Sequence, residues 1–472
     1  MKLFGTDGIR GKVGEFPITP IDMEKLGFAI SKSLFKDKDG LVLISHDGRI
    51  SANEIEEALR KGISKYGAYV TSLDLISTPA LSYFIRKLQL NNRKDNLKIP
   101  CHIGIQITAS HNSYHDNGIK IFNANGLKIS EEQENEIENT FNGLKKLLEN
   151  SETTWKDSNI EGITAKEVNH EYSLAAKKYL QNKVTKEKNK KFLIMIDCAN
   201  GATSNHVENI FDDSDNVDIL PIYNQPSGTN INNKCGTTYI DALKEQIQFH
   251  NSAEQKKIDL GVAFDGDGDR AIFVTPNSNV MNGDEVLYIL SKFKREHKNY
   301  QGPVVGTLMT NHGIQSAYKK IGIDFHTTNI GDKFVFQKMR DINAELGGES
   351  SGHIITTDFI DIPIGDGIIT LINLLEVLSE LKLNLNNLKE VTANIIVPSK
   401  LINIAVSNKK NFMENKLNKK VIANLEKKVT NFGRILIRAS GTENLIRLLI
   451  EHQDSEEINK LEKYFYDNIQ KT

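Results

Sequence analysis

The sequence is poor in cysteine and has no long apolar run. Its three cysteines, Cys101, Cys198 and Cys235, are odd in number and far apart in 472 residues. They therefore predict reduced thiols in a cytoplasmic protein, and argue against a disulfide framework or a zinc site. No run approaches the roughly 18 apolar residues that a membrane span needs, and the start, MKLFGTDGIRG, has no apolar signal segment. We expect no membrane association.

The sequence also has no excess of charge of either sign. Its 59 basic and 61 acidic residues leave a formal net charge of −2. Nucleic-acid binding is not expected, because no electrostatic footprint for a polyanion is present. No short-period repeat occurs, which argues against a solenoid. The length exceeds what one hydrophobic core holds, so several domains are predicted.

One pattern of strand, polar loop, helix and strand occurs three times. The first copy runs from the strand at 40–49 into a helix at 52–67, which Ser51 and Glu54 are predicted to open as a capping box. Similar copies begin at 191–203 and 302–313. Such units predict α/β domains whose sheets are covered by helices. The pattern stops near residue 385, and the domains are predicted at 1–165, 166–275, 276–385 and, as a smaller α+β domain, 386–472.

Ser110 lies in a polar loop after alternating isoleucines that predict a half-buried strand. Asn117-Gly118 is predicted to turn the chain into a second strand at 119–122. A lone Ser-His-Asn loop is most often only a turn. The G-x-S-x-G elbow of hydrolases is absent, and an acyl-transfer triad with the neighbouring His111 is poorly supported.

Three carboxylates alternate with glycine in FDGDGDRAIF, residues 264–273. Asp265, Asp267 and Asp269 can converge because glycine lets the loop curl, and a hard divalent cation would relieve their repulsion. The alternative is an Asp-Gly turn between two strands. An EF-hand does not fit, since Arg270 stands where that motif needs glycine. Three ligands from one tight loop leave open positions, which suits a catalytic Mg²⁺.

Two further loops combine polar side chains with glycine. GGESSGHI, residues 347–354, presents Glu349, Ser351 and His353, which suits sugar hydroxyls, although a plain Gly-rich turn is equally compatible. RASGTENLIR, residues 438–447, surrounds a Ser-Gly-Thr turn with arginines and suits a phosphate, against the alternative of an ordinary turn. Together with Ser110 and the carboxylates, these loops indicate phosphoryl transfer on a sugar phosphate.

In these four loops the sequence resembles the α-D-phosphohexomutase family. TASHN resembles its phosphoserine loop, DGDGD its metal loop, GESSGH its sugar loop and RASGTE its phosphate loop, in family order over nearly the whole chain. The resemblance implies an α/β fold of three related domains with mixed sheets, a smaller C-terminal α+β domain, and an active site in the central cleft. It also implies an isomerase that works through a phosphoserine and a hexose bisphosphate.

Within the family, FGTDGIRG, the doubled glycine of GGESSGHI and GDG at 365–367 resemble the branch that interconverts glucosamine 6-phosphate and glucosamine 1-phosphate. Such an enzyme would supply UDP-N-acetylglucosamine and cell-wall precursor synthesis. Ser113 and Asn444 stand where the family usually has proline, which would loosen both loops. Ser350 replaces the glutamine typical of the branch and puts sugar preference in question.

The resemblance assigns roles to individual residues. Ser110 would be the phosphorylated nucleophile and would bind Mg²⁺ together with Asp265, Asp267 and Asp269. The other catalytic candidates are Arg10, Lys120 and His353. The substrate-binding candidates are Arg270, Asp332, Glu349, Ser351, Arg438, Ser440, Gly441, Thr442 and Arg447.

One Mg²⁺ per site and a hexose or hexosamine 1,6-bisphosphate activator are implied, with a sugar phosphate as the small-molecule partner. A mutase acting on glucose or mannose phosphates, a metal-dependent sugar phosphatase and a non-catalytic sensor are the alternatives. The intact Ser110 and aspartates argue against the sensor. The oligomeric state is left open, with a homodimer as one option.

Overall fold

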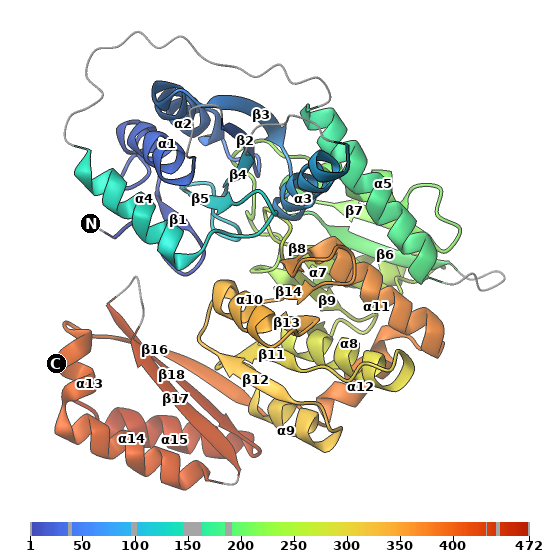
Figure 1. The fold of residues 1–472 in the computed structure, drawn as a ribbon. Coiled ribbons are helices and arrows are strands. Elements are labelled where there is room, and N and C mark those ends of the chain that lie inside the picture. Colours follow the sequence, from blue (N-terminus) through green and yellow to red (C-terminus); the bar gives the residue numbers. More distant parts are fainter. Residues whose placement is uncertain are drawn as a thin grey trace. The chain divides into compact units, whose positions relative to one another are not determined.

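The computed structural model describes residues 2–35, 40–95, 102–144, 163–184, 191–430, 432–439 and 444–470 (Figure 1). The chain divides into two compact units. One consists of Met1–Met309 with Ile323–Lys389, and the other of Thr310–Gly322 with Glu390–Thr472.

The first unit contains three five-stranded sheets built on one plan. In each, one strand next to the edge runs parallel to both of its neighbours, and the two strands at the other side of the sheet form antiparallel pairs. The first sheet has the order β1 (Ile9–Lys12), β5 (Asp116–Phe122), β4 (His102–Ile107), β2 (Leu41–His46) and β3 (Tyr69–Leu75).

The other two sheets repeat this arrangement of parallel and antiparallel pairs. The second has the order β10 (Val280–Met281), β9 (Ala271–Val274), β8 (Leu260–Phe264), β6 (Phe192–Asp197) and β7 (Val217–Ile222). The third has the order β12 (Phe325–Thr328), β11 (Val304–Thr307), β13 (Leu346–Gly348), β14 (Ile354–Thr356) and β15 (Ile364–Gly365). The prediction of three related α/β domains with mixed sheets is confirmed.

The helices of the first unit cover these sheets. They are α1 (Pro20–Leu34), α2 (Ala52–Tyr66), α3 (Thr78–Asp95), α4 (Glu131–Gly143), α5 (Ala165–Lys183), the 3₁₀ turn η1 (Ala202–Asn205), α6 (Val207–Phe211), α7 (Ile240–Ala253), α8 (Gly283–His297), α10 (Asp332–Asp341) and α11 (Gly367–Leu381). A further helix, α12 (Leu385–Ala393), spans the division between the units.

The first domain shows how the sequence fixes this packing. Ile55, Leu59 and Ile63 recur at helical spacing on α2 and are buried in one core with α1, α4 and the sheet. Gly62 lets α2 approach α1, because a Cβ there would lie 1.8 Å from the carbonyl oxygen of Glu24. Helix α3 packs on β4, and helix α5 packs on β3.

The predicted capping box at the start of α2 is wrong. Ser51 has helical backbone angles and makes no side-chain capping bond. Its hydroxyl instead accepts a hydrogen bond from the Asn117 side-chain amide at 2.9 Å. A contact 66 residues away along the chain therefore replaces the local cap.

The predicted Asn117-Gly118 turn is also wrong. Both residues lie inside β5, with Gly118 opposite Arg10 of β1. The glycine is needed for close strand packing, since a Cβ there would lie 2.3 Å from the carbonyl oxygen of Ile9. The chain turns earlier, within 110–115.

The second unit has a three-stranded antiparallel sheet with β18 in the centre. Helices α14 and α15 pack on it around a core that includes Leu425, Leu448 and Phe465. The elements are α9 (His312–Lys320), β16 (Ser399–Ala405), α13 (Lys409–Glu414), α14 (Lys416–Val429), β17 (Gly433–Ala439), β18 (Leu445–His452) and α15 (Ser455–Asn468). The expected small α+β C-terminal domain is confirmed.

The boundary predicted at residue 275 differs from the extent of the second sheet. Strand β10 pairs with β9 and so extends the second sheet past residue 275, where the sequence placed a boundary.

Cys198 and Cys235 are buried free thiols, whereas Cys101 lies outside the described residues. None of the helices in the described ranges is long and apolar enough to cross a membrane.

Candidate active site

The three candidate loops of the first unit occupy equivalent positions in their sheets. Residues 108–115 join β4 to β5, 265–270 join β8 to β9, and 349–353 join β13 to β14. In each case the loop leaves the carboxyl end of the middle strand of the sheet, which is parallel to its neighbour on one side. Ligands of α/β proteins bind at such ends. The sequence predicted each loop, but not this equivalence.

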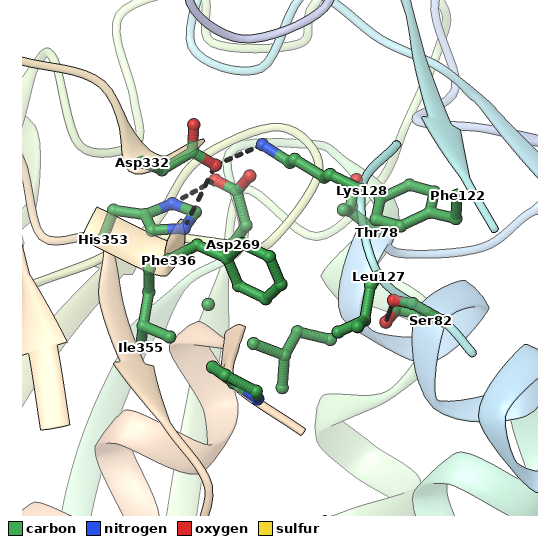
Figure 2. Close-up of a pocket in the computed structure, with 14 residues that line it drawn as sticks. Thr78, Ser82, Phe122, Leu127, Lys128, Asp269, Asp332, Phe336, His353 and Ile355 are labelled. Carbon is green, nitrogen blue, oxygen red and sulfur yellow. Dashed lines mark hydrogen bonds and ion pairs between the residues drawn. The ribbon is translucent and has the colours of Figure 1, made fainter. Parts of the chain in front are cut away.

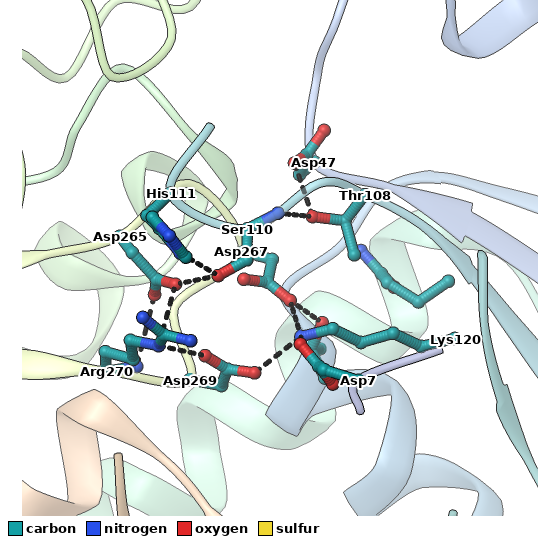
Figure 3. A network of polar contacts seen from close by, with 12 residues as sticks. Asp7, Asp47, Thr108, Ser110, His111, Lys120, Asp265, Asp267, Asp269 and Arg270 are labelled. Carbon is teal, nitrogen blue, oxygen red and sulfur yellow. Dashed lines mark hydrogen bonds and ion pairs between the residues drawn. The ribbon is translucent and has the colours of Figure 1, made fainter. Parts of the chain in front are cut away.

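Ser110 is buried with its hydroxyl directed at the carboxylate loop (Figure 3). Its Oγ donates a hydrogen bond to Oδ2 of Asp265 at 2.6 Å. Its backbone N–H donates to the Thr108 hydroxyl at 2.7 Å, and that hydroxyl donates to Asp47 at 2.6 Å. The backbone of Ser110 is left-handed, with φ of 52°, which is unusual for a residue with a Cβ. The surrounding contacts must therefore hold this conformation.

The carboxylates of Asp265, Asp267 and Asp269 converge as predicted, with one oxygen from each lying within 4.8 Å of the others. All three side chains are buried. Burial, followed by repulsion from the other two carboxylates, raises the pKa of Asp265 well above its usual value. Oδ1 of Asp267 is buried and has no hydrogen-bond partner among the described residues. A divalent cation fits this donor set, because it would relieve the repulsion and use the unpartnered oxygen.

Lys120 of β5 reaches this cluster from the first domain. Its Nζ lies 2.7 Å from Asp267 and 2.6 Å from Asp269 (Figure 3). Burial acts to lower the pKa of Lys120, but nearby carboxylates outweigh it and hold the pKa well above its usual value. Burial likewise acts to raise the pKa of Asp269, but Lys120 and His353 hold it well below. Lys120 is therefore a fixed positive charge at the site.

Six side chains form a closed ring of opposite-charge contacts, which we call the charge ring. His353 Nδ1 lies 3.4 Å from Asp269 and its Nε2 lies 3.6 Å from Asp332 (Figure 2). Burial acts to lower the pKa of His353, but the two aspartates outweigh it and raise the pKa, which favours the imidazolium. The ring runs through Asp7, Lys128, Asp332, His353, Asp269 and Lys120, and returns to Asp7. It joins all three domains of the first unit.

The other predicted residues of the first unit lie around the ring. Arg10 pairs with Asp7, and Arg270 Nε lies 3.8 Å from Asp265. Glu349 accepts a hydrogen bond from the backbone N–H of Gly331 at 3.0 Å. The Ser351 hydroxyl is buried without a hydrogen-bond partner among the described residues. Its free donor and acceptor capacity is compatible with a ligand contact.

A small cavity of about 40 Å³ lies beside the charge ring (Figure 2). Lys128, Asp332 and His353 form its polar end, and Leu127 and Phe336 contribute to its apolar side. This volume holds only about three water molecules, because one water needs roughly 10–15 Å³ of such space. The cavity is too small to be a complete hexose site.

In the second unit, Arg438 of β17 and Arg447 of β18 are directly opposite each other. Directly opposed like charges destabilise a sheet unless an anion lies between them. Burial, followed by Arg447, lowers the pKa of Arg438. Ser440, Gly441 and Thr442 lie outside the described residues.

Comparison with known families matches four regions of the chain to the four domains of phosphoglucomutase/phosphomannomutase. Domain I matches residues 1–147, domain II 170–278, domain III 282–395, and the C-terminal domain 401–468. A phosphoglucosamine mutase from Buchnera aphidicola is 37% identical over 473 residues, which cover 99% of this chain and 97% of that protein. The chain belongs to the phosphoglucomutase/phosphomannomutase family.

A second relative supports the same assignment. The phosphoglucosamine mutase of Histophilus somni is 38% identical over 455 residues, covering 96% of each chain. The resemblance to the α-D-phosphohexomutase family is thus confirmed, and the protein is an isomerase of that family.

Solved structures of the family share the fold. A phosphoglucomutase/phosphomannomutase family protein from Burkholderia thailandensis has a TM-score of 0.76 at 20% identity, covering 99% of this chain and 96% of that one. N-acetylphosphoglucosamine mutase from Aspergillus fumigatus, solved with GlcNAc-6P and magnesium, has a TM-score of 0.61 at 17% identity, covering 91% and 82%.

Asp7 and Lys128 were missed from the sequence, and His111 was considered only as a poorly supported partner in an acyl-transfer triad. His111 Nδ1 lies 3.3 Å from the Ser110 hydroxyl, although the two are chain neighbours. Burial, then Arg270, lowers the pKa of His111 to about 3, so the ring is neutral. Asp7 stands in the recognised N-terminal motif but was not singled out. Lys128 carries no motif, and only its position in space identifies it.

Proposed function

We propose that the protein is a phosphoglucosamine mutase that interconverts glucosamine 6-phosphate and glucosamine 1-phosphate. The observation that carries the proposal is the Ser110 hydroxyl, which donates to Asp265 at 2.6 Å at the edge of a buried three-carboxylate cluster. The choice of glucosamine is supported by the relatives of this name, which are 36–38% identical over nearly the whole chain.

Ser110 is the proposed carrier of the phosphoryl group. A hydroxyl of the bound monophosphate attacks the phosphorus of phosphoserine, the bond from phosphorus to Ser110 Oγ breaks, and a sugar bisphosphate forms. The proton of the sugar hydroxyl is delivered, in net terms, to Ser110 Oγ. The bisphosphate then reorients and returns its other phosphoryl group to Ser110. A hexose or hexosamine 1,6-bisphosphate would also prime unmodified Ser110, which explains its role as an activator.

Asp265, Asp267, Asp269 and an oxygen of phosphoserine are the proposed ligands of one Mg²⁺. When bound, the cation would offset charge on the transferring phosphoryl group. Lys120 is already held in its charged form by its neighbours. We therefore assign Lys120 an electrostatic role beside the transferring phosphoryl group. Arg10 and Arg270 supply further positive charge.

Sugar and phosphate recognition are assigned to the remaining loops. Glu349 and Ser351 would bind hydroxyls, with Asp332 and His353 near the reacting end. Arg438 and Arg447, with Ser440, Gly441 and Thr442, would bind the phosphate that is not transferred. The opposed arginines support this, because a phosphate between them would remove their mutual repulsion.

The decisive test combines turnover with intact-mass measurement. The purified protein, with Mg²⁺ and glucose 1,6-bisphosphate, is assayed on the 6-phosphates of glucosamine, glucose and mannose. We expect the highest kcat/KM on glucosamine 6-phosphate, and a phosphoryl adduct that Ser110→Ala removes together with activity. Preference for another hexose would assign a sibling mutase. Release of inorganic phosphate without isomerisation would assign a phosphatase.

A further inference from the structure

The Ser110 loop is held by a buried arginine outside the proposed chemistry. Arg49 follows β2, and its side chain is fully buried. Its Nε donates to Asp47 at 3.0 Å. Its two terminal nitrogens donate to four backbone carbonyl oxygens, those of Ser110, Asn112 and Ser113 in the loop and that of Asp116 at the start of β5. The planar fork of a guanidinium suits this convergence of acceptors.

Asn232 holds the same loop from the second domain. Its side-chain nitrogen donates to the carbonyl oxygens of Ser110 at 2.8 Å and Asn112 at 3.0 Å. The two facing carbonyls require the amide nitrogen, and not its oxygen, on this side. The backbone of Asn232 is left-handed, with φ of 53°, and its N–H donates to Ala199 at 2.9 Å. The backbone of Asn232, which carries the side-chain amide, is therefore anchored just beyond the end of β6.

The carboxylate loop meets the same carbonyl. A Cβ on Gly266 would lie 2.7 Å from the Ser110 carbonyl oxygen and 3.0 Å from the Asn232 side-chain nitrogen. The Ser110 carbonyl is thus enclosed by Arg49 of the first domain and by Asn232 and Gly266 of the second. Holding this carbonyl restrains the Ser110 backbone, from which Oγ projects toward Asp265.

We propose that Arg49 and Asn232 are positioning residues for phosphoryl transfer, which hold the Ser110 carbonyl and so fix Ser110 Oγ against the carboxylates. The inference rests on the proposed role of Ser110. A left-handed serine persists only where its surroundings hold it, and these donors supply that restraint. They also engage the negative end of the carbonyl dipole, which would otherwise be free to turn toward a phosphoryl group.

Asn232→Gly tests the proposal, because glycine accepts the left-handed backbone and removes only the amide. Misplacement of a reacting group by 1 Å can cost about a hundredfold in rate. We expect kcat to fall at least about tenfold, with KM for the sugar phosphate within about twofold, since no sugar-binding side chain changes. The rate of Ser110 phosphorylation by glucose 1,6-bisphosphate, followed by intact mass, should fall by the same factor.

Lys234→Gly is the matched control. Lys234 is exposed in the same loop and has the same left-handed φ of 53°, so glycine there should leave both rates unchanged. Asn232→Asp keeps the side-chain shape and replaces the donor by an acceptor, so its rates should fall at least as far. Arg49→Lys keeps the charge beside Asp47 but loses the planar fork, and should show the same separation of kcat from KM.

Unchanged phosphorylation and turnover in folded Asn232→Gly and Asn232→Asp would overturn the proposal. A raised KM with unchanged kcat would also overturn it, because it would place Asn232 in substrate binding. A wild-type protein that is phosphorylated at Ser110 but does not isomerise glucosamine phosphates would instead contradict the proposed substrate. In that case the rate of Ser110 phosphorylation in each variant would still test the positioning roles of Arg49 and Asn232.

Discussion

Gly266→Ala should test the effect of displacing the Ser110 nucleophile without changing any charged side chain in the site. The φ of Gly266 is not in the left-handed region, so alanine is excluded by space and not by backbone conformation. Its Cβ would lie 2.7 Å from the Ser110 carbonyl oxygen and 2.7 Å from Cδ1 of Ile231. Ordinary contact begins at 3.4 Å, so 3.4 minus 2.7 gives a required displacement of 0.7 Å.

The Ile231 side chain can rotate, but the Ser110 carbonyl is backbone held by Arg49 and Asn232. Overpacking of this kind costs about 1–3 kcal/mol of stability. A shift of this size at the nucleophile should lower kcat about ten- to hundredfold, which corresponds to about 1.4–2.7 kcal/mol in the barrier.

The assay compares kcat, KM and the thermal midpoint for Gly266→Ala and Gly143→Ala. Gly143 ends α4, and a Cβ there meets nothing within 4 Å, so this variant should keep wild-type kcat and a similar or higher midpoint. If Gly266→Ala loses stability but keeps kcat within about twofold, the loop contact does not set the reacting geometry. The reasoning would then be refuted.

Two further predictions concern the metal and the phosphate. Chelation should abolish turnover, and Asp267→Asn should lower kcat more than it raises KM, because the carboxylates act mainly on the transition state; activity that survives exhaustive chelation would contradict the metal role. Arg438→Ala should raise KM for either monophosphate about ten- to hundredfold, as expected for the loss of a charge-assisted hydrogen bond. It should also release more bisphosphate intermediate while Ser110 is still phosphorylated, and a lost phosphoserine would instead place Arg438 in the chemistry.

The fold class, Ser110 and the three aspartates could be predicted from the sequence because local patterns encode them. Alternating isoleucines correctly predicted the strand before Ser110, but wrongly predicted it to be half-buried, since all of β4 is buried. Glycines between the aspartates predicted a curled loop after β8. The convergence of Asp265, Asp267 and Asp269 followed from that loop alone. Motifs of this kind need no knowledge of distant partners.

The errors arose where distant residues decide a local choice. The Ser51 hydroxyl binds Asn117 and not the start of its own helix. Asn117-Gly118 looks like a turn, but Gly118 serves a strand that approaches Ile9. Lys128 and Asn232 have no local signature, because their roles depend on Asp332 and Ser110, which are 204 and 122 residues away.

The charge ring has a consequence for how the protein is made. Lys120 and Asp269 are 149 residues apart, and a ribosome adds about 5–20 residues per second, so roughly 7–30 s separate their synthesis. In the finished protein Lys120 is only 2% exposed. During the interval Asp7 is its only ring partner already synthesised, and Lys128 likewise still lacks Asp332. A nascent or truncated chain is therefore electrostatically different here from the complete enzyme, whose second and third domains bring the balancing carboxylates.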